Sequence, residues 1–331
     1  MAKVSLKDVA NRLNVSAATV SLVLNGKDKD GRISKTLAEK IRIEAKALNY
    51  EPNSFAKGLR SGRSETIGLI VADISNPFFA HLAFHIQEHA EQHGYSVIIT
   101  NTNESTEKME KMISILKSRQ VDGFIIVPTE HSEKLIEKLI RDKRPVVLLD
   151  RYFQGIDVSY VVINNYQASM EATNLLLNLN CKRIALIIYR NYLPHIQDRK
   201  NGYIAAMSQR GLFEPKLVKE VNYRTLAGDI QKAMMELVSG GEKVDGIFFA
   251  TNTIATIGLK ILTGLKMEIQ KDVKVICFDK SDAFDLSNIS IPFVQQPIAE
   301  MGKHAVDVLV QQMTQKDVTM IHHELEANLE Y

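Results

Sequence analysis

Residues 5–26 read SLKDVANRLNVSAATVSLVLNG and contain two short helical patterns separated by a tight turn. The first pattern covers residues 6–13, where apolar side chains recur at helical spacing after Ser5, a residue that can cap a helix. The second covers residues 17–24, which follow Ser16 and end at an Asn-Gly pair, the usual signals for the start and the stop of a helix. Two short helices across a tight turn predict a helix-turn-helix.

A third helix is predicted at 34–48, with Ser34 as its cap and one apolar face that can support the other two. In a helix-turn-helix the second helix enters the DNA major groove and presents its first residues to the base edges. These residues are small and mostly polar, which permits a close approach: Ser16, Ala17, Ala18, Thr19 and Ser21. Spacing alone leaves a generic three-helix bundle as the alternative.

The N-terminal segment is also the basic part of the chain. Residues 1–63 hold 13 Lys and Arg against 6 Asp and Glu, a formal charge of +7, whereas the remainder carries −5 and the whole chain +2. A basic segment on a mildly acidic body suggests a polyanionic partner, and a merely solvated basic face is the alternative.

From residue 65 onward the pattern alternates between short apolar runs and helical stretches. Because strands alternating with helices are typical of βαβ units, this part predicts parallel sheets with helices on both faces. The pattern starts again after residue 160, which indicates two similar halves. The runs that predict strands are 67–73, 95–101, 123–128, 145–150, 160–164, 183–189, 245–251 and 273–279, and the first helices are expected at 79–92, 106–118 and 132–142.

Polar residues follow the predicted strands in both halves. Ligands of such sheets bind beyond the carboxyl ends of the strands, so two halves that face each other would gather these side chains in one cleft. Each of them taken alone is more simply a turn or cap residue. The set comprises Asp73, Asn101, Asp150, Arg151, Asn164, Asn252 and Asp279.

The composition excludes several other classes of protein. Hydrophobic residues are 45% and charged residues 24%, as in packed globular proteins, and no run of about 18 apolar residues predicts a membrane span. The two cysteines, Cys181 and Cys277, cannot form a disulfide framework, and the first residues lack a secretory pattern, so we expect a reducing cytoplasm.

Enzyme signatures are also missing, since GxGxxG, Walker A, HExxH and GxSxG do not occur. Four histidines share i, i+4 spacing on one predicted helix, but no carboxylate or cysteine joins them at a fixed spacing. They are His81, His85, His89 and His93. A surface or dimer-facing helix is the favoured interpretation, and we expect no metal, no cofactor and no catalytic residue.

Residues 5–26 resemble the helix-turn-helix of the lactose-repressor (LacI/GalR) family of bacterial transcription regulators. LNYEPNSFAKGLRSG (48–62) resembles the hinge helix of that family, and IGLIVADISNPFF (67–79) resembles the start of its effector core. VDGFIIVP, PVVLLDR, RKNGYIAAM, GIFFATNTIATIGL, VKVICFD and VQQPIAEMG follow in the family order over nearly all 331 residues.

The resemblance implies an all-α helix-turn-helix headpiece at residues 1–50 and a hinge helix or linker at 51–64. An α/β effector-binding and dimerisation core at 65–331 would resemble type I periplasmic sugar-binding proteins. Its two subdomains would comprise about 65–162 with 293–321, and about 163–290 with 322–331.

The resemblance also implies a sequence-specific regulator, with repression expected, under allosteric control by a small polar effector, a sugar or sugar derivative. Its partners would be a pseudo-palindromic duplex operator and a second copy of the chain, or more copies, in the bacterial cytoplasm with no membrane contact. Major-groove residues would be Ser16, Ala17, Ala18, Thr19, Ser21, Leu22 and Asn25. Ser5, Ser34 and Asn53 would reach phosphates, and Leu59 would wedge into the minor groove beside Ala56.

The effector positions that match the family combine aromatic rings, which stack on sugars, with groups that bind hydroxyls. They are Asn76, Phe78, Phe79, Asp150, Arg151, Arg199, Asn252, Asp279 and Gln296. Phe78 and Phe79 could equally belong to the core at a helix start. Whether the effector releases the regulator from DNA or recruits it stays open.

Three departures from the family pattern affect these expectations. Leu22 replaces the usual Arg, so a bidentate contact to guanine is lost and a thymine methyl becomes the expected target. The loop KDKDGR (27–32) is longer than usual, and Thr253 stands where Asp is common.

Two rival classes remain. A transport binding protein would need a signal peptide and has no use for residues 1–63, and an enzyme would need an acid–base or metal group, which we do not find.

Overall fold

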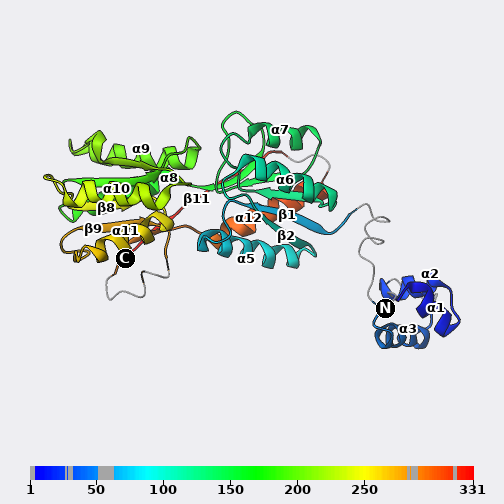
Figure 1. Cartoon of the computed structure of the whole chain (residues 1–331). Coiled ribbons are helices and arrows are strands. Elements are labelled where there is room, and N and C mark those ends of the chain that lie inside the picture. The colour runs from blue at the N-terminus through cyan, green and yellow to red at the C-terminus, as the bar shows by residue number, and fades with distance from the viewer. Residues whose placement is uncertain are drawn as a thin grey trace. The chain divides into compact units, whose positions relative to one another are not determined.

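The computed structural model describes residues 4–26, 28, 33–50, 63–281, 284, 290–315 and 319–331. The chain divides into two compact units, Met1–Ser64 and Glu65–Tyr331. The first is the helical headpiece and the second the α/β core (Figure 1).

The headpiece contains α1 (Leu6–Leu13), α2 (Ala17–Leu24) and α3 (Lys35–Ala47), as the sequence predicts. Apolar side chains at helical spacing meet in one small core, because each helix turns a single face inward. The fully buried members include Val9, Val20 and Ile41.

Side-chain caps fix where the headpiece helices begin. The Ser16 hydroxyl accepts the Thr19 N–H at 3.0 Å, and the Ser34 hydroxyl accepts the Leu37 N–H at 3.2 Å. Ser5 donates its N–H to the Asp8 carboxylate at 2.7 Å, the reciprocal bond of a capping box.

The core unit is built on two sheets of six strands. The first has the order β11 (His322–Leu325), β5 (Ser159–Ile163), β4 (Val146–Leu149), β3 (Gly123–Ile126), β1 (Thr66–Val71) and β2 (Ser96–Asn101), all parallel. The second has the order β12 (Asn328–Glu330), β10 (Phe293–Gln295), β9 (Lys274–Phe278), β8 (Gly246–Phe249), β6 (Ile184–Tyr189) and β7 (Val218–Val221), with only β12 antiparallel to its neighbour.

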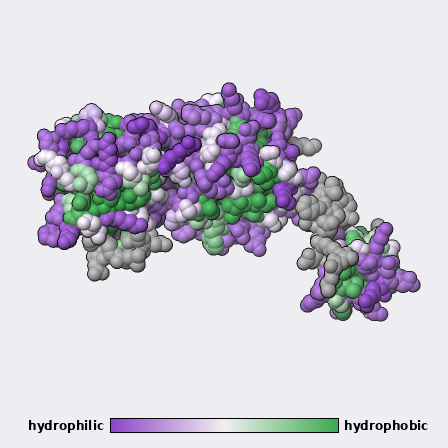
Figure 2. Space-filling view, in the orientation of Figure 1, coloured by the Kyte–Doolittle hydropathy of each residue, from purple (hydrophilic) through white to green (hydrophobic). Residues whose placement is uncertain are grey.

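Helices cover both faces of each sheet (Figure 1). On the first sheet α5 (Pro77–Gln92) and α12 (Ile298–Thr314) cover one face, and α6 (Thr106–Ser118) and α7 (Glu133–Arg141) the other. On the second, α8 (Asn165–Asn178) and α9 (Pro194–Gln209) lie opposite α10 (Leu226–Ser239) and α11 (Asn252–Gly264), and a 3-10 turn, η2 (Pro215–Leu217), precedes β7. The face seen in Figure 2 is mostly hydrophilic.

The eight predicted strands are all present, and four short ones (β7, β10, β11 and β12) were not predicted. The chain crosses between the sheets three times, and two crossings differ from the expected subdomain ranges. Residues 293–295, expected in the first subdomain, pair with β9 of the second sheet. Residues 322–325, expected in the second, pair with β5 of the first. Both crossings therefore fall a few residues later, because backbone pairing and not composition decides which sheet a short strand joins.

One glycine controls the packing of α8 against α9. A Cβ on Gly202 would clash with the Tyr166 carbonyl oxygen and lie 3.0 Å from the Met170 N. The two backbones therefore approach each other closely only because residue 202 has no side chain. None of the helices in the described ranges combines the length and apolar character that a membrane crossing needs.

Candidate functional site

The exposed side of α2 carries the residues expected in the major groove. Val20 and Val23 turn into the headpiece core, whereas Ala18, Leu22 and Asn25 are exposed along the opposite side. Ala17, Thr19 and Ser21 lie half-buried beside them. This row of short side chains leaves the α2 backbone open to close approach by a base-pair edge.

Leu22 is the largest side chain of that row, with 42% of its surface exposed. The Asn25 amide is held by the Ser21 carbonyl at 2.6 Å, so this side chain is oriented before any DNA arrives. Ser5 and Ser34 are exposed at the first turns of α1 and α3, where N–H groups favour phosphate. Asn53, Ala56 and Leu59 lie outside the described residues.

A cavity of about 510 Å³ lies between the two sheets of the core, at the carboxyl ends of their strands. Loops after β1, β2, β3 and β4 line it from the first sheet, and loops after β6, β7, β8 and β9 from the second. Such a volume suits a small organic ligand.

Eight of the nine expected effector residues line this cavity. They are Asn76, Phe78, Phe79, Asp150, Arg151, Arg199, Asp279 and Gln296. Asn252 lies behind the wall, where its amide donates to Asn76 Oδ1 at 3.1 Å. Thr253, which stands where Asp is common in the family, still gives the cavity lining a polar group. Its hydroxyl oxygen lies 3.4 Å from Asn76 Nδ2.

Phe78 and Phe79 serve both the core and the cavity. Each is 5% exposed, and the rings meet edge to face with centroids 5.0 Å apart. Asn76 accepts the Phe78 N–H at 3.0 Å and starts α5, so the helix start sets both rings against the ligand space.

Arg199 is buried and fixed from behind. Its Nε donates to Asn165 Oδ1 and its Nη1 to the Ala250 carbonyl, both at 2.8 Å, and its guanidinium lies 3.5 Å above the Phe278 ring. Burial lowers the pKa of Arg199, and the nearby carboxylates of Asp279 and Asp150 oppose that shift. The side chain therefore presents a rigid cationic edge to the cavity.

Two aspartates face the same space. Asp150 and Asp279 each end a strand with a positive φ, 67° and 70°, which turns the side chain off the strand direction. Burial raises the pKa of Asp279 to about 6 and also raises the pKa of Asp150. Arg199 opposes both shifts, and Arg151 opposes that of Asp150. Gln296 donates to Asp279 Oδ1 at 2.7 Å. A ligand that donates hydrogen bonds would stabilise these two buried carboxylates, because a buried acceptor without a donor is costly.

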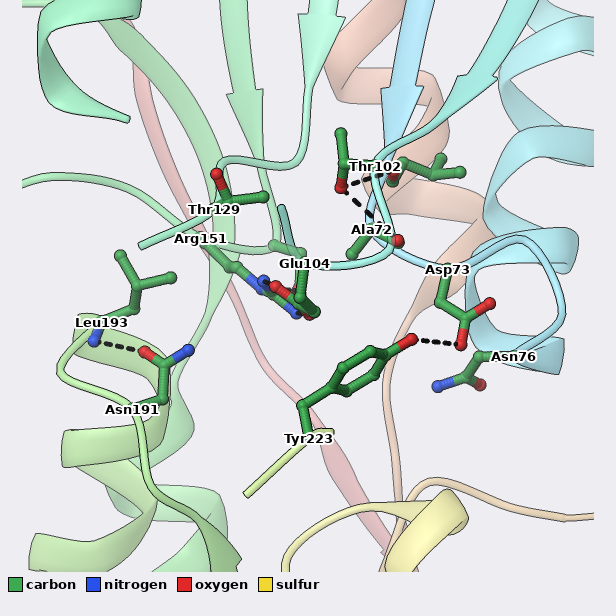
Figure 3. A network of polar contacts seen from close by, with 12 residues as sticks. Ala72, Asp73, Asn76, Thr102, Glu104, Thr129, Arg151, Asn191, Leu193 and Tyr223 are labelled. Atoms are coloured by element: carbon green, nitrogen blue, oxygen red, sulfur yellow. Dashed lines mark hydrogen bonds and ion pairs between the residues drawn. The ribbon is translucent and has the colours of Figure 1, made fainter. Parts of the chain in front are cut away.

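Several lining residues were not expected from the sequence. Glu104 forms a two-point ion pair with Arg151, with N–O distances of 2.7 and 2.8 Å (Figure 3). His195 is buried near Arg151 and Arg199, and its pKa is well below the usual value because of burial and both cations. No short motif could reveal them, because their partners are distant in sequence. The remaining unexpected side chains include Asn103, Glu130, Tyr189, Arg190, Asn191, Asn222, Tyr223 and Arg224.

Direct hydrogen bonds join the two subdomains across the cavity. Tyr223 donates to the Asp73 carboxylate at 3.0 Å, and in Figure 3 its ring reaches across toward the loop after β1. The Tyr192 N–H donates to Glu130 at 2.7 Å. The two subdomains are therefore linked directly, and separating them would break these bonds.

In the described part of the chain, no group of three or more His, Cys, Asp or Glu side chains is placed to hold a metal ion. Of the four histidines, His81, His85 and His89 lie on α5 and His93 caps its C-terminal end. His93 approaches Asp307 at 3.2 Å and His85 approaches Glu88 at 3.5 Å. Both cysteines are buried and free.

Comparisons with known proteins agree with a headpiece joined to a binding core. Residues 5–53 match "Bacterial regulatory proteins, lacI family", and residues 64–328 match "Periplasmic binding proteins and sugar binding domain of LacI family". The ribose operon repressor of Halalkalibacterium halodurans is 31% identical over 98% of this chain and 95% of its own. Catabolite control protein A of Priestia megaterium is 28% identical over 99% and 98%.

Among solved structures, the lac repressor dimer bound to operator and an anti-inducer has the same fold, with a TM-score of 0.85 at 20% identity over 99% of this chain and 98% of that one. These matches define a class of ligand-responsive DNA-binding regulators. The chain belongs to the LacI family: it is a DNA-binding transcription regulator with a core of the sugar-binding type, and its relatives are regulators and not enzymes.

Proposed function

We propose that this regulator binds a small, uncharged polyhydroxylated effector, a sugar or sugar derivative, in the 510 Å³ cavity. The observation that carries the proposal is the pairing of buried acceptors with buried donors there. Asp150 and Asp279 accept, and Arg199 donates from a fixed position. A ligand with several hydroxyls, each both donor and acceptor, satisfies this set, and the two phenylalanine rings offer an apolar face.

The names of relatives bear on the kind of sugar. The relative at 31% identity is a ribose operon repressor, and a structural neighbour from Alkaliphilus metalliredigens at 23% identity is described in complex with D-xylulofuranose. Pentoses are therefore the first probes for this cavity.

On the DNA side, α2 reads the major groove of an operator half-site, and a second copy of the chain reads the other half. We propose a homodimer that represses transcription in the cytoplasm, where the chromosome is. The effector acts through the core: it bridges the subdomains where Tyr223 meets Asp73 and so shifts the balance between closed and open forms.

The test combines ligand binding with DNA binding on the full chain. Pentoses and hexoses are screened by the rise in thermal unfolding temperature and then by their effect on an operator selected from random DNA. Arg199→Gln should abolish both responses and keep operator binding without ligand. Arg210→Gln, the same change on the exposed end of α9, is the matched control and should respond as the wild type does. An undiminished sugar response in Arg199→Gln contradicts the assigned site.

A further inference from the structure

Arg151 lines the cavity, yet the protein itself uses most of its hydrogen-bonding capacity. Nη1 and Nη2 donate to the two oxygens of Glu104, Nη1 also to the Pro128 carbonyl at 3.3 Å, and Nε to Asp150 at 3.3 Å. A guanidinium has five N–H donors, so within the described chain four are used and one remains. The two-point face that would bind a phosphate or carboxylate is occupied by Glu104.

An unusual turn after β2 places Glu104 on Arg151. Asn103 and Glu104 are consecutive non-glycine residues with φ of 49° and 55°, in the left-handed region. The Asn101 amide bonds to the Asn103 side chain and supports this turn after β2. Two left-handed residues in succession therefore deliver one carboxylate into the cavity.

Arg199 differs from Arg151 in what surrounds it. The amide oxygen of Asn165 and the carbonyl of Ala250 hold two of its five donors, and no carboxylate in the described chain pairs with it directly. Arg199 therefore keeps donors for a ligand, whereas Arg151 serves mainly to hold Glu104 and Asp150 in place.

We propose that Glu104 is a specificity-determining residue: by occupying the Arg151 guanidinium it makes this end of the cavity reject anionic ligands, those that carry a phosphate or carboxylate, in favour of neutral ones. This inference rests on the proposed effector site. Glu104 is 47 residues from Arg151 in sequence, and its side chain is 20% exposed against 8% for the arginine. An anionic group at this position would meet the carboxylates of Glu104 and Asp150 with only one free donor to offset them.

The experiment removes the occupying carboxylate and uses inorganic phosphate as the probe. The unfolding temperature of the full chain is measured at increasing phosphate concentration and constant ionic strength. R151Q lacks the cavity guanidinium, so its response measures the phosphate that binds elsewhere, as on the basic DNA-binding headpiece. Wild type should match R151Q. E104Q should bind phosphate about tenfold or more tightly than wild type, the range expected for charge-assisted bonds at a released guanidinium.

E130Q is the matched control. Glu130 lines the same cavity and loses the same charge, but it bonds the Tyr192 N–H and not Arg151. If E130Q gained as much phosphate affinity as E104Q, net charge alone would explain why the cavity excludes anions, and the role assigned to Glu104 would be wrong. A larger phosphate response in wild type than in R151Q would also overturn it, because the Arg151 guanidinium would then already be open to anions. This comparison does not depend on how E104Q folds.

E104D keeps the charge but shortens the side chain, and it should give a smaller gain than E104Q; no gain in either variant also refutes the proposal. The phosphate titration contains no sugar, so a negative result would contradict the role of Glu104 but not the proposed effector site. Loss of the sugar site in the Arg199 experiment, in turn, does not alter the phosphate result.

Discussion

Replacing the buried carboxyl of Asp279 by an amide should make the core more stable at neutral pH. Burial raises the pKa of Asp279 from 3.8 to about 6. Below the unfolded value the carboxyl is protonated in both states and costs nothing. Between the unfolded value and about pH 6 the unfolded chain has lost this proton while the folded protein still holds it, so stability falls as the pH rises and levels off above 6, where the folded protein carries a desolvated carboxylate. A shift of about 2 pKa units corresponds to about 3 kcal/mol, of which about 2 kcal/mol falls between pH 4.5 and 7.5.

Asp279→Asn keeps the shape and can still accept the Gln296 N–H, so the comparison isolates the charge. The free energy of unfolding is measured for both proteins in urea, followed by far-UV circular dichroism, from pH 4.5 to 7.5. The difference between variant and wild type should grow by about 2 kcal/mol over this range. Parallel profiles, or a difference that shrinks as the pH rises, would refute the assigned burial.

The same residue predicts how the effector responds to pH. A ligand hydroxyl that donates to Asp279 favours the ionised form, so binding to wild type should tighten by up to about tenfold per pH unit below 6 and level off above it. Isothermal titration of a bound pentose measures this slope. A slope of zero in wild type would exclude a donor at Asp279.

Three further outcomes are expected. Affinity for duplex DNA should fall about 10³–10⁵-fold between roughly 50 and 200 mM salt, because residues 1–63 carry +7 per chain; a flat response in a titration would contradict phosphate neutralisation. Ser16→Ala should destabilise the headpiece by about 1 kcal/mol through loss of the α2 cap, measured by denaturation, and an unchanged midpoint would show that the cap contributes nothing. Gly202→Ala should destabilise the core by about 1–3 kcal/mol through its clash with α8. Gly228→Ala in α10, where a Cβ meets nothing within 4 Å, should instead stabilise it by up to about 1 kcal/mol, and equal effects would refute the close approach.

Local signals were enough to predict the headpiece and most of the core strands. Ser16 and Ser34 cap helices at the positions that hydroxyl residues before an apolar stripe predict. The strands of both sheets are short apolar runs because parallel strands are covered on both faces. Four expected effector positions, Asp150, Arg151, Asn252 and Asp279, also follow predicted strands, where ligand-binding groups gather, and the other five were implied by the resemblance to the family.

Residues whose roles depend on a distant partner could not be predicted. The strand His322–Leu325 carries two histidines and a glutamate, and only pairing with β5 makes it a strand of the first sheet. Glu104 has nothing in its neighbourhood in sequence to mark it as the partner of Arg151. Asn252 matches the expected site, yet it supports Asn76 from behind the cavity wall.

Hydrophobic periodicity and helix caps act over a few residues, so the element types, the two-part organisation and the chemical kinds of side chain at the strand ends can all be predicted from the amino-acid sequence. Which charged side chains meet, in contrast, depends on how the two sheets pack. Arg151 is bound by Glu104 and Arg199 by neutral oxygens, although either arginine could have faced a ligand. Pairing of buried charges depends on distances and desolvation set by two packed sheets, and those quantities exist only when the whole chain is folded.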